Sequence, residues 1–275
     1  MSDLGASYNF CRRIARTRAR NFYYSFLLLS REQRESMCAI YAFMRYCDDI
    51  SEGEGASREA IELWRRDLDR ALEGHYGKNL LWPAFHDTVE RYRIPHKYFH
   101  EMIDGVSSDL EPRQIQTFDE LYQYCYQVAS VVGLTIVHIF GFESREALLL
   151  AEKCGIAFQL TNILRDIRED SESQRVYIPT EDIRRFGADL AKRDENFIRL
   201  MRFEAQRARG FYDESRPLID LVHRRSRSSL WALIEIYRRL LDRIERSDYD
   251  VLRRRIRVPT WEKIGILIRA GRTNR

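Results

Sequence analysis

Two clusters of acidic side chains each end an unusually apolar segment of the sequence. The first lies in "CDDISE" (47–52), where Asp48 and Glu52 are four residues apart. The preceding segment, 37–47, contains a single charged residue, Arg45. A helix that is apolar nearly all round belongs in a protein interior, where ionised carboxylates are costly unless positive charge meets them. The first cluster therefore predicts a cation at the end of a buried helix.

The second cluster has the same form. Segment 154–164 carries no charge, and it leads into Asp166 and Asp170. Asn162, Asp166 and Asp170 follow one another at intervals of four residues, which places their side chains along one face of a helix. Two facing sets of carboxylates would repel each other unless cations lay between them. Because Mg²⁺ takes oxygen ligands together with substrate phosphates, we expect Mg²⁺, with Mn²⁺ as the alternative, bound by Asp48, Glu52, Asn162, Asp166 and Asp170.

Arginines and apolar segments accompany both clusters. Arg45 precedes Asp48 by about one helical turn, and Arg165 is adjacent to Asp166. Guanidinium groups bind phosphate oxygens well. A further uncharged segment, 128–142, could pack with the other two to enclose something elongated. The combination indicates a site for a diphosphate that carries a long apolar tail.

The elements that position these residues are predicted to be helices. The capping patterns "SREQ" (30–33) and "TFDE" (117–120) predict helix starts. No alternating run bounded by turn residues predicts a strand, and no repeat or linker divides the chain. We therefore expect one all-α domain over residues 1–275.

Charge is distributed unevenly along the chain. The formal net charge is +4, too small to indicate a nucleic-acid partner. Residues 1–175 contain 22 Lys or Arg and 27 Asp or Glu, whereas residues 176–275 contain 24 and 15. The basic last third suits an anionic membrane surface or anionic ligands. Five cysteines without metal-binding spacing, and no apolar leader, favour a cytoplasmic location, at most peripheral to the inner face of the membrane.

Four segments together resemble the squalene/phytoene synthase family, the head-to-head prenyl diphosphate synthases. They are 21–52, which ends in the first acidic cluster; "YCYQVASVVG" (124–133); "GIAFQLTNILRDIRED" (155–170) with "RVYIP" (175–179); and 236–255. The resemblance implies an isoprenoid synthase fold, a helical bundle around a central apolar cavity. It also implies that Mg²⁺ binds between the two acidic motifs.

The resemblance implies a two-step reaction on two prenyl diphosphates through a cyclopropylcarbinyl diphosphate. Overall similarity favours farnesyl diphosphate as the substrate, with squalene or a related C30 compound as the product. NADPH would be needed only if squalene is formed. Phytoene made from geranylgeranyl diphosphate is the alternative. An apolar product would also suit peripheral contact with a membrane, whereas the oligomeric state stays open.

Residue by residue, the resemblance assigns catalytic roles to the four outer carboxylates, Asp48, Glu52, Asp166 and Asp170, and to Tyr41. It assigns substrate contacts to Asn21, Phe22, Tyr41, Arg45, Tyr124, Val128, Gly133, Gln159, Asn162, Arg165, Tyr237 and Arg254. Two positions depart from the family pattern. Glu52 replaces the Asp that usually closes the first motif, and Asn21 stands where a small hydroxyl residue is common.

Three alternatives use the same features. Head-to-tail elongation or terpene cyclisation would need similar chemistry, but "DDISE" does not have the DDxxD spacing. A non-catalytic relative acting as an assembly factor would tolerate Glu52. A di-iron helical bundle also contains buried acids, but none of the six histidines follows a Glu at the required spacing of three residues.

Overall fold

The protein is a bundle of helices. The computed structural model describes residues 4–19, 22–52 and 55–273, except for the side chains of Phe22, Glu52 and Thr273. The α-helices are α1 (Leu4–Arg18), α2 (Phe22–Phe26), α3 (Arg31–Glu52), α4 (Arg58–Leu72), α5 (Trp82–Tyr92), α6 (Lys97–Ser107), α7 (Phe118–Cys125), α8 (Val131–Phe140), α9 (Glu146–Glu172), α10 (Thr180–Phe186), α11 (Glu195–Glu214), α12 (Leu218–Leu221), α13 (Arg224–Arg246) and α14 (Thr260–Thr273). The predicted all-α class is confirmed.

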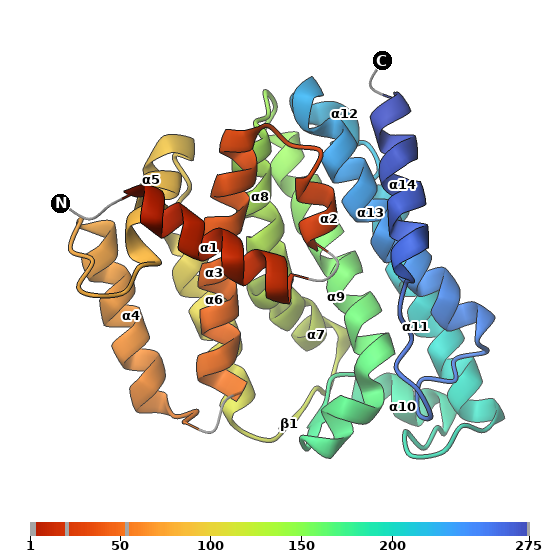
Figure 1. Ribbon diagram of the computed structural model, residues 1–275. Helices are drawn as coiled ribbons and strands as arrows, with labels where there is room; N and C mark the ends of the chain where they lie inside the picture. Colours follow the sequence, from red (N-terminus) through yellow and green to blue (C-terminus); the bar gives the residue numbers. More distant parts are fainter. Residues whose placement is uncertain (1–3, 20–21, 53–54, 274–275) are drawn as a thin grey trace.

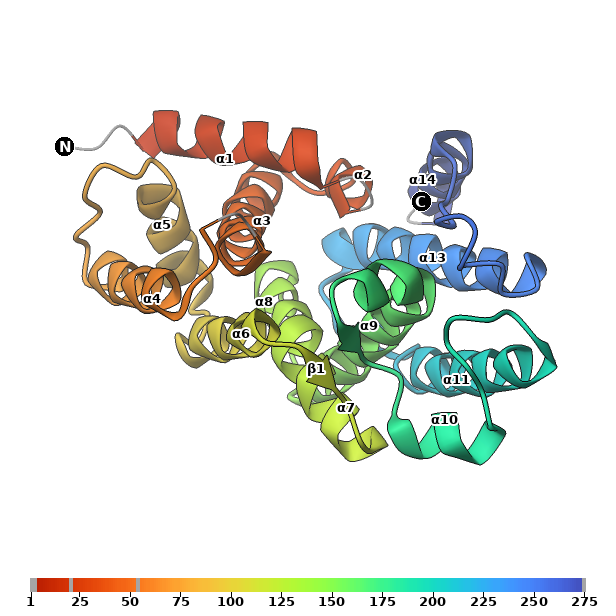
Figure 2. The ribbon, with the colours of Figure 1, turned by 90° about the horizontal axis from the view of Figure 1, so that it is seen from below.

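The long helices run roughly alongside one another around α8 and α9 (Figure 1). Seen along the bundle, α3 and α6 lie on one side of these two helices and α11 and α13 on the other (Figure 2). α9 packs against both α8 and α11. α8 also packs against α3, so the three segments predicted to be central, 37–47, 128–142 and 154–164, meet in the interior.

Side-chain caps fix several helix starts. The Thr117 hydroxyl accepts a hydrogen bond from the Glu120 backbone N–H at 3.3 Å, and Ser30 accepts one from Gln33 N–H at 3.3 Å. Both predicted starts are confirmed. The side chain of Gln33, however, also turns inward and donates to the Ile139 carbonyl and to Ser226, joining α3 to α8 and α13.

No sheet was expected from the pattern of residues, but a very short one exists. β1 (Arg113–Gln114) pairs in parallel with β2 (Arg175–Val176). Two-residue strands are too short to show an alternating pattern, which is why periodicity missed them. The pairing ties the segment after α6 to the segment after α9.

The helix that contains α7 and α8 is interrupted by a π-helical turn, η2 (Tyr126–Ser130). This turn is pressed against α9, since a Cβ added at Gly155 would lie 2.5 Å from the Ser130 Cα. A Cβ at Gly133 would lie 2.9 Å from the Ala151 carbonyl oxygen. Both glycines thus permit close packing of helix backbones. π-turns are frequent at functional sites, and Val128 and Ala129 of this one line the cavity described below.

Two segments, Phe118–Phe140 and Glu146–Glu172, are long and apolar enough to cross a membrane by length and composition alone. More than half of the most apolar window in each is buried inside the protein. Core helices of globular proteins pass the same test, so this finding is weak support for a membrane span.

Candidate active site

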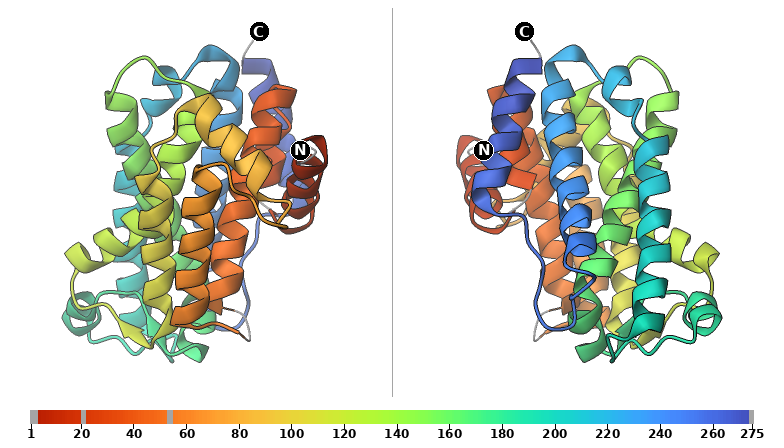
Figure 3. Two further views of the ribbon diagram at one scale, coloured as in Figure 1. Left: turned by 90° about the vertical axis from the view of Figure 1, so that its left-hand side faces the viewer. Right: turned by 90° about the vertical axis from the view of Figure 1, so that its right-hand side faces the viewer.

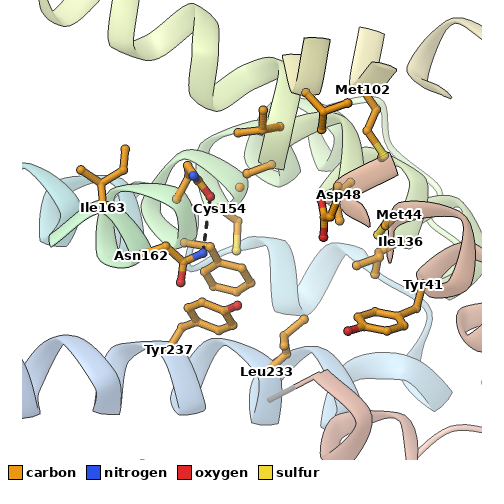
Figure 4. Close-up of a pocket in the computed structure, with 18 of the residues that line it drawn as sticks. Tyr41, Met44, Asp48, Met102, Ile136, Cys154, Asn162, Ile163, Leu233 and Tyr237 are labelled. Carbon is orange, nitrogen blue, oxygen red and sulfur yellow. Dashed lines mark hydrogen bonds between the residues drawn. The ribbon is translucent and has the colours of Figure 1, made fainter. Parts of the chain in front are cut away.

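A cavity of about 450 Å³ opens between α3, α8, α9 and α13 (Figure 4). Its inner part is apolar and is lined by Phe26, Met37, Ile136, Leu218, Leu230 and Leu233. Its other end carries the acidic clusters and several arginines, with Asp48 on α3 and Asn162 on α9 approaching from opposite sides. One space therefore joins a charged end to an apolar interior.

On the α3 side, Arg45 holds the first cluster in place. Its guanidinium donates to the Asp49 carboxylate and lies 3.8 Å from the Asp48 carboxylate. Asp48 faces the cavity, whereas Asp49 is not among the residues that line it. Because the Arg45 side chain is largely shielded from water, its charge acts strongly at this end of the cavity.

On the α9 side, two arginines bind one carboxylate. Arg165 forms a two-point ion pair with Asp166, its neighbour in sequence. Arg255, from the segment after α13, donates to the same carboxylate at 3.0 Å. Both guanidinium groups therefore lie where a phosphate could be bound through several oxygens.

Asp170 lies one turn beyond Asp166, in surroundings that disfavour its ionised form. Burial, and next the charge of Asp166, raise the pKa of Asp170 to about 7. Asp109 and Arg175 are close enough to influence it. A cation would relieve both the desolvation and the repulsion.

Asp109 belongs to a hydrogen-bonded group at the edge of the cavity. Its carboxylate accepts from the hydroxyls of Tyr124, at 2.9 Å, and Tyr177, at 2.8 Å. Burial raises the pKa of Asp109, while the two phenol hydrogen bonds and the nearby Arg175 act in the opposite direction. The rings of Tyr124 and Tyr177 stack with centroids 4.7 Å apart. The group holds the rings of Tyr124 and Tyr177 in place in the cavity wall.

Aromatic rings line the apolar part. Tyr237 stacks on Phe158 with ring centroids 4.2 Å apart, and Tyr41 projects into the cavity from α3 (Figure 4). Burial raises the pKa of Tyr41 to about 12 and that of Tyr237 to about 12, so both phenols are neutral. Their faces can stabilise positive charge that develops nearby.

The donors at the charged end suit a divalent cation. The buried Asn162 Oδ1 has no hydrogen-bond partner in the part of the chain described, although Asn162 Nδ2 donates weakly to Gln159 at 3.4 Å. Asp48, Asp166 and Asp170 line the same cavity. Among the described residues, no three acidic, histidine or cysteine side chains converge closely enough to form a ready-made metal cage. The set therefore fits a cation bound jointly with a phosphate ligand rather than by protein alone.

Most of the residues assigned from the sequence line this cavity. They are Tyr41, Arg45, Asp48, Tyr124, Val128, Gly133, Gln159, Asn162, Arg165, Asp166, Asp170 and Tyr237. Asn21 and the side chains of Phe22 and Glu52 lie outside the described residues, and Glu52 is placed only as the last residue of α3. Arg254 is exposed and does not line the cavity.

Sequence reasoning missed several lining residues. Arg255 occupies the position expected for Arg254, one residue away in a run of three arginines beyond the end of α13. Asp109 lies in a short 3-10 helix (Ser108–Leu110) before β1, Arg175 lies in β2, and Tyr177 directly follows β2. The resemblance of "RVYIP" (175–179) to a family segment was the available signal for Arg175 and Tyr177.

The sequence matches one protein family, and individual members of it, over most of its length. The squalene/phytoene synthase family model matches residues 15–262. A phytoene synthase from Arthrospira platensis is 37% identical over 94% of this chain and 90% of its own length. The 15-cis-phytoene synthase of Synechococcus elongatus is 34% identical over 96% of this chain and 92% of its own length.

Solved structures agree with this fold. A dehydrosqualene synthase determined in complex with a ligand superposes with a TM-score of 0.91 over 98% of this chain and 97% of that one, at 27% identity. The squalene synthase HpnC from Alicyclobacillus acidocaldarius gives a TM-score of 0.83 over 90% of this chain and 96% of that one, at 28% identity.

Proposed function

The chain belongs to the squalene/phytoene synthase family, and from this premise we propose that it joins two molecules of geranylgeranyl diphosphate head to head to give phytoene. Relatives named phytoene synthase, which match over nearly their whole length, support this product. The resemblance found in the sequence favoured farnesyl diphosphate as the substrate. The named relatives instead support the alternative, phytoene made from geranylgeranyl diphosphate. They also identify a prenyltransferase rather than an assembly factor, a head-to-tail enzyme or a di-iron bundle.

One arrangement carries the proposal. Carboxylates and arginines from α3, α9 and the segment after α13 lie at one end of a cavity whose remaining wall is apolar and aromatic. A prenyl diphosphate has the same division, with a charged head and an apolar chain. The cavity can therefore bind the head and exclude water from the chain in a single orientation.

Asp48, Asp166, Asp170 and the Asn162 Oδ1 are the donors that we propose for Mg²⁺ or Mn²⁺. A divalent cation bound there would add positive charge beside the diphosphate and make that group easier to expel. Glu52, at the end of α3, is the further donor implied by the family pattern.

The chain's own residues account for the rest of the chemistry. Arg45, Arg165 and Arg255 would bind the diphosphate oxygens and stabilise the negative charge that grows as the C1–O bond breaks. The double bond of the second substrate then attacks the allyl cation, and loss of a proton closes a cyclopropane ring. Ionisation of that intermediate, rearrangement and a second proton loss give phytoene. The apolar lining keeps water from capturing the cations.

A C30 product is the second candidate. It is favoured by the close structural agreement with a dehydrosqualene synthase and a squalene synthase, although the sequence identity to both is lower than to the phytoene synthases. Squalene would require hydride from NADPH, whereas dehydrosqualene and phytoene would not.

The test is incubation of the purified protein with Mg²⁺ and either geranylgeranyl or farnesyl diphosphate, with and without NADPH. We expect phytoene from geranylgeranyl diphosphate, with no effect of NADPH. A preference for farnesyl diphosphate, expressed as kcat/KM, would replace the C40 proposal with the C30 one. No Mg²⁺-dependent release of diphosphate from either substrate would overturn both.

A further inference from the structure

Helix α14 exposes apolar side chains on the face that points away from the protein. Trp261, Ile264 and Ile268 are 70%, 47% and 53% exposed, and their spacing of three and four residues places them in one stripe. The opposite face is buried, with Ile266 and Ala270 packed on α13. A surface helix normally has polar residues on its outer face, so this stripe calls for an apolar partner.

The stripe is part of one side of the molecule. α1, α2 and α14 lie along the same edge of the bundle in Figure 2, and both side views in Figure 3 place α1 and α14 on the same side. α2 packs directly against α14. Leu27, in the turn after α2, is 45% exposed and adds to the apolar surface.

This side is also strongly basic. α1 has no acidic residue and exposes Arg12, Arg13, Arg16 and Arg18. An open recess of about 420 Å³ between α1 and the start of α3 is lined by Arg12, Arg16, Tyr23, Arg31, Arg34 and Glu35. Glu35 pairs with Arg31 at 3.0 Å, whereas in the described part of the chain no carboxylate lies within 4.0 Å of Arg16 or Arg34. The recess can therefore accept phosphate groups.

At α2 a single helix separates this side from the cavity, whereas at α13 the helix α14 forms a second, outer layer. In α2, Phe26 lines the cavity while Tyr24 packs in the small cluster beneath α14. In α13, Leu233 lines the cavity while Ile236 packs against α14. A surface that covers α2 thus lies directly behind the part of the apolar wall that Phe26 forms.

We propose that α14 and the arginine recess form a docking surface for a phospholipid bilayer with anionic headgroups. Trp261, Ile264 and Ile268 enter the interface between headgroups and acyl chains, while the arginines contact lipid phosphates. Docking sets α2, whose Phe26 lines the cavity, close to the lipid, with α14 between α13 and the lipid. If the proposed function holds, this gives a water-insoluble hydrocarbon product a short path into the bilayer.

A second copy of the chain is a less suitable occupant. A symmetric dimer would bring the same patch of each subunit together. The arginines of α1 and the recess would then approach their own counterparts, and like charges in such a contact repel. A bilayer containing anionic lipid supplies both the apolar layer and the opposite charge.

Vesicle flotation of the full chain tests the proposal. We expect binding to vesicles of phosphatidylcholine with about a third phosphatidylglycerol, and weak binding to phosphatidylcholine alone. Replacing Trp261, Ile264 and Ile268 together with Ser should lower the partition coefficient at least about tenfold. The matched control replaces Leu63 on α4 and Leu149 on α9 with Ser, since these are 56% and 65% exposed, and it should bind as the unaltered chain does.

The basic component is tested separately. Arg16→Gln with Arg34→Gln should weaken binding to anionic vesicles and flatten its dependence on NaCl, because fewer phosphate contacts are screened. The proposal would be overturned if the Ser triple variant and its control bound vesicles equally. It would also be overturned if the unaltered chain bound equally to vesicles with and without anionic lipid. A concentration-dependent dimer that the triple variant abolishes would overturn it as well. Turnover measured in detergent micelles reports on the proposed function alone and should be unchanged in the triple variant.

Discussion

Arg255 donates a hydrogen bond to Asp166 across 89 residues of sequence, at 3.0 Å. The contact holds the segment after α13 at the charged end of the cavity, where Arg165 also binds the Asp166 carboxylate. Two guanidinium groups thus bind one carboxylate, that of Asp166 on α9. The arrangement makes Arg255, rather than its neighbours in "RRR", the residue able to reach a diphosphate.

The first prediction compares adjacent arginines. Arg255→Ala should lower kcat/KM by roughly 10- to 100-fold, because it removes a charge-assisted contact at the diphosphate position. Arg254→Ala is the matched control, since Arg254 is exposed and outside the cavity lining, and it should change kcat/KM less than about threefold. Steady-state kinetics on both variants checks this. The opposite ranking would restore the assignment made from the sequence.

The second prediction concerns Asp166. Asp166→Asn keeps the shape of the side chain but removes the charge that two arginines bind and that a cation would require. Turnover should fall by more than about 100-fold, with far-ultraviolet circular dichroism nearly unchanged. The Mg²⁺ concentration for half-maximal residual activity should rise. Full activity at the same Mg²⁺ requirement would remove Asp166 from the site.

The third prediction concerns packing beneath the π-turn. Gly155→Ala should destabilise the protein by about 1–3 kcal/mol, because the new Cβ would lie 2.5 Å from the Ser130 Cα and backbone atoms must move. Gly210→Ala on α11 is the control. In the described structure, no atom outside the neighbouring backbone of its own helix lies within 4 Å of the new Cβ, so this substitution should stabilise the protein by about 0.5–1 kcal/mol. Urea unfolding measures both changes, and similar effects in the two variants would contradict the close contact.

The sequence could predict the acidic clusters because each is local. Asn162, Asp166 and Asp170 belong to one helix, so their spacing alone places them on one face. Asp109 could not be found in this way. It enters the site only because tertiary packing brings it to the hydroxyls of Tyr124 and Tyr177, and no periodicity connects residues from a turn, a helix and a strand end.

Close helix packing was also beyond sequence reasoning. The family resemblance assigned Gly133 only a substrate contact, but in the structure its missing side chain also lets the Ala151 carbonyl approach. The π-turn at 126–130 adds a residue to a helix without any local composition that marks it. Arg254 and Arg255 show the same limit. They lie outside a regular helix, so no helical periodicity indicates which of the two adjacent arginines faces the cavity.

The last prediction concerns a buried carboxyl group away from the cavity. Glu204 is 2% exposed and contacts Arg207 at 2.8 Å, while Arg207 also binds Asp182 of α10. Burial raises the pKa of Glu204 to about 8, because its desolvation together with the charge of Asp182 outweighs the attraction of Arg207. The folded protein therefore holds a proton on Glu204 that the unfolded chain, with a pKa near 4.5, releases at lower pH.

Folding stability should consequently decrease as the pH rises through this range. The contribution of the protonated group is complete below about pH 4.5 and is lost as the pH passes the folded-state pKa of about 8. Glu204→Gln keeps the side-chain shape and leaves Arg207 its partner Asp182, so it should lose less stability than the unaltered chain between pH 6 and 9. Urea midpoints at the two pH values measure the difference. Parallel losses in both proteins would mean that Glu204 is ionised in the folded state and that its ion pair with Arg207 outweighs its burial.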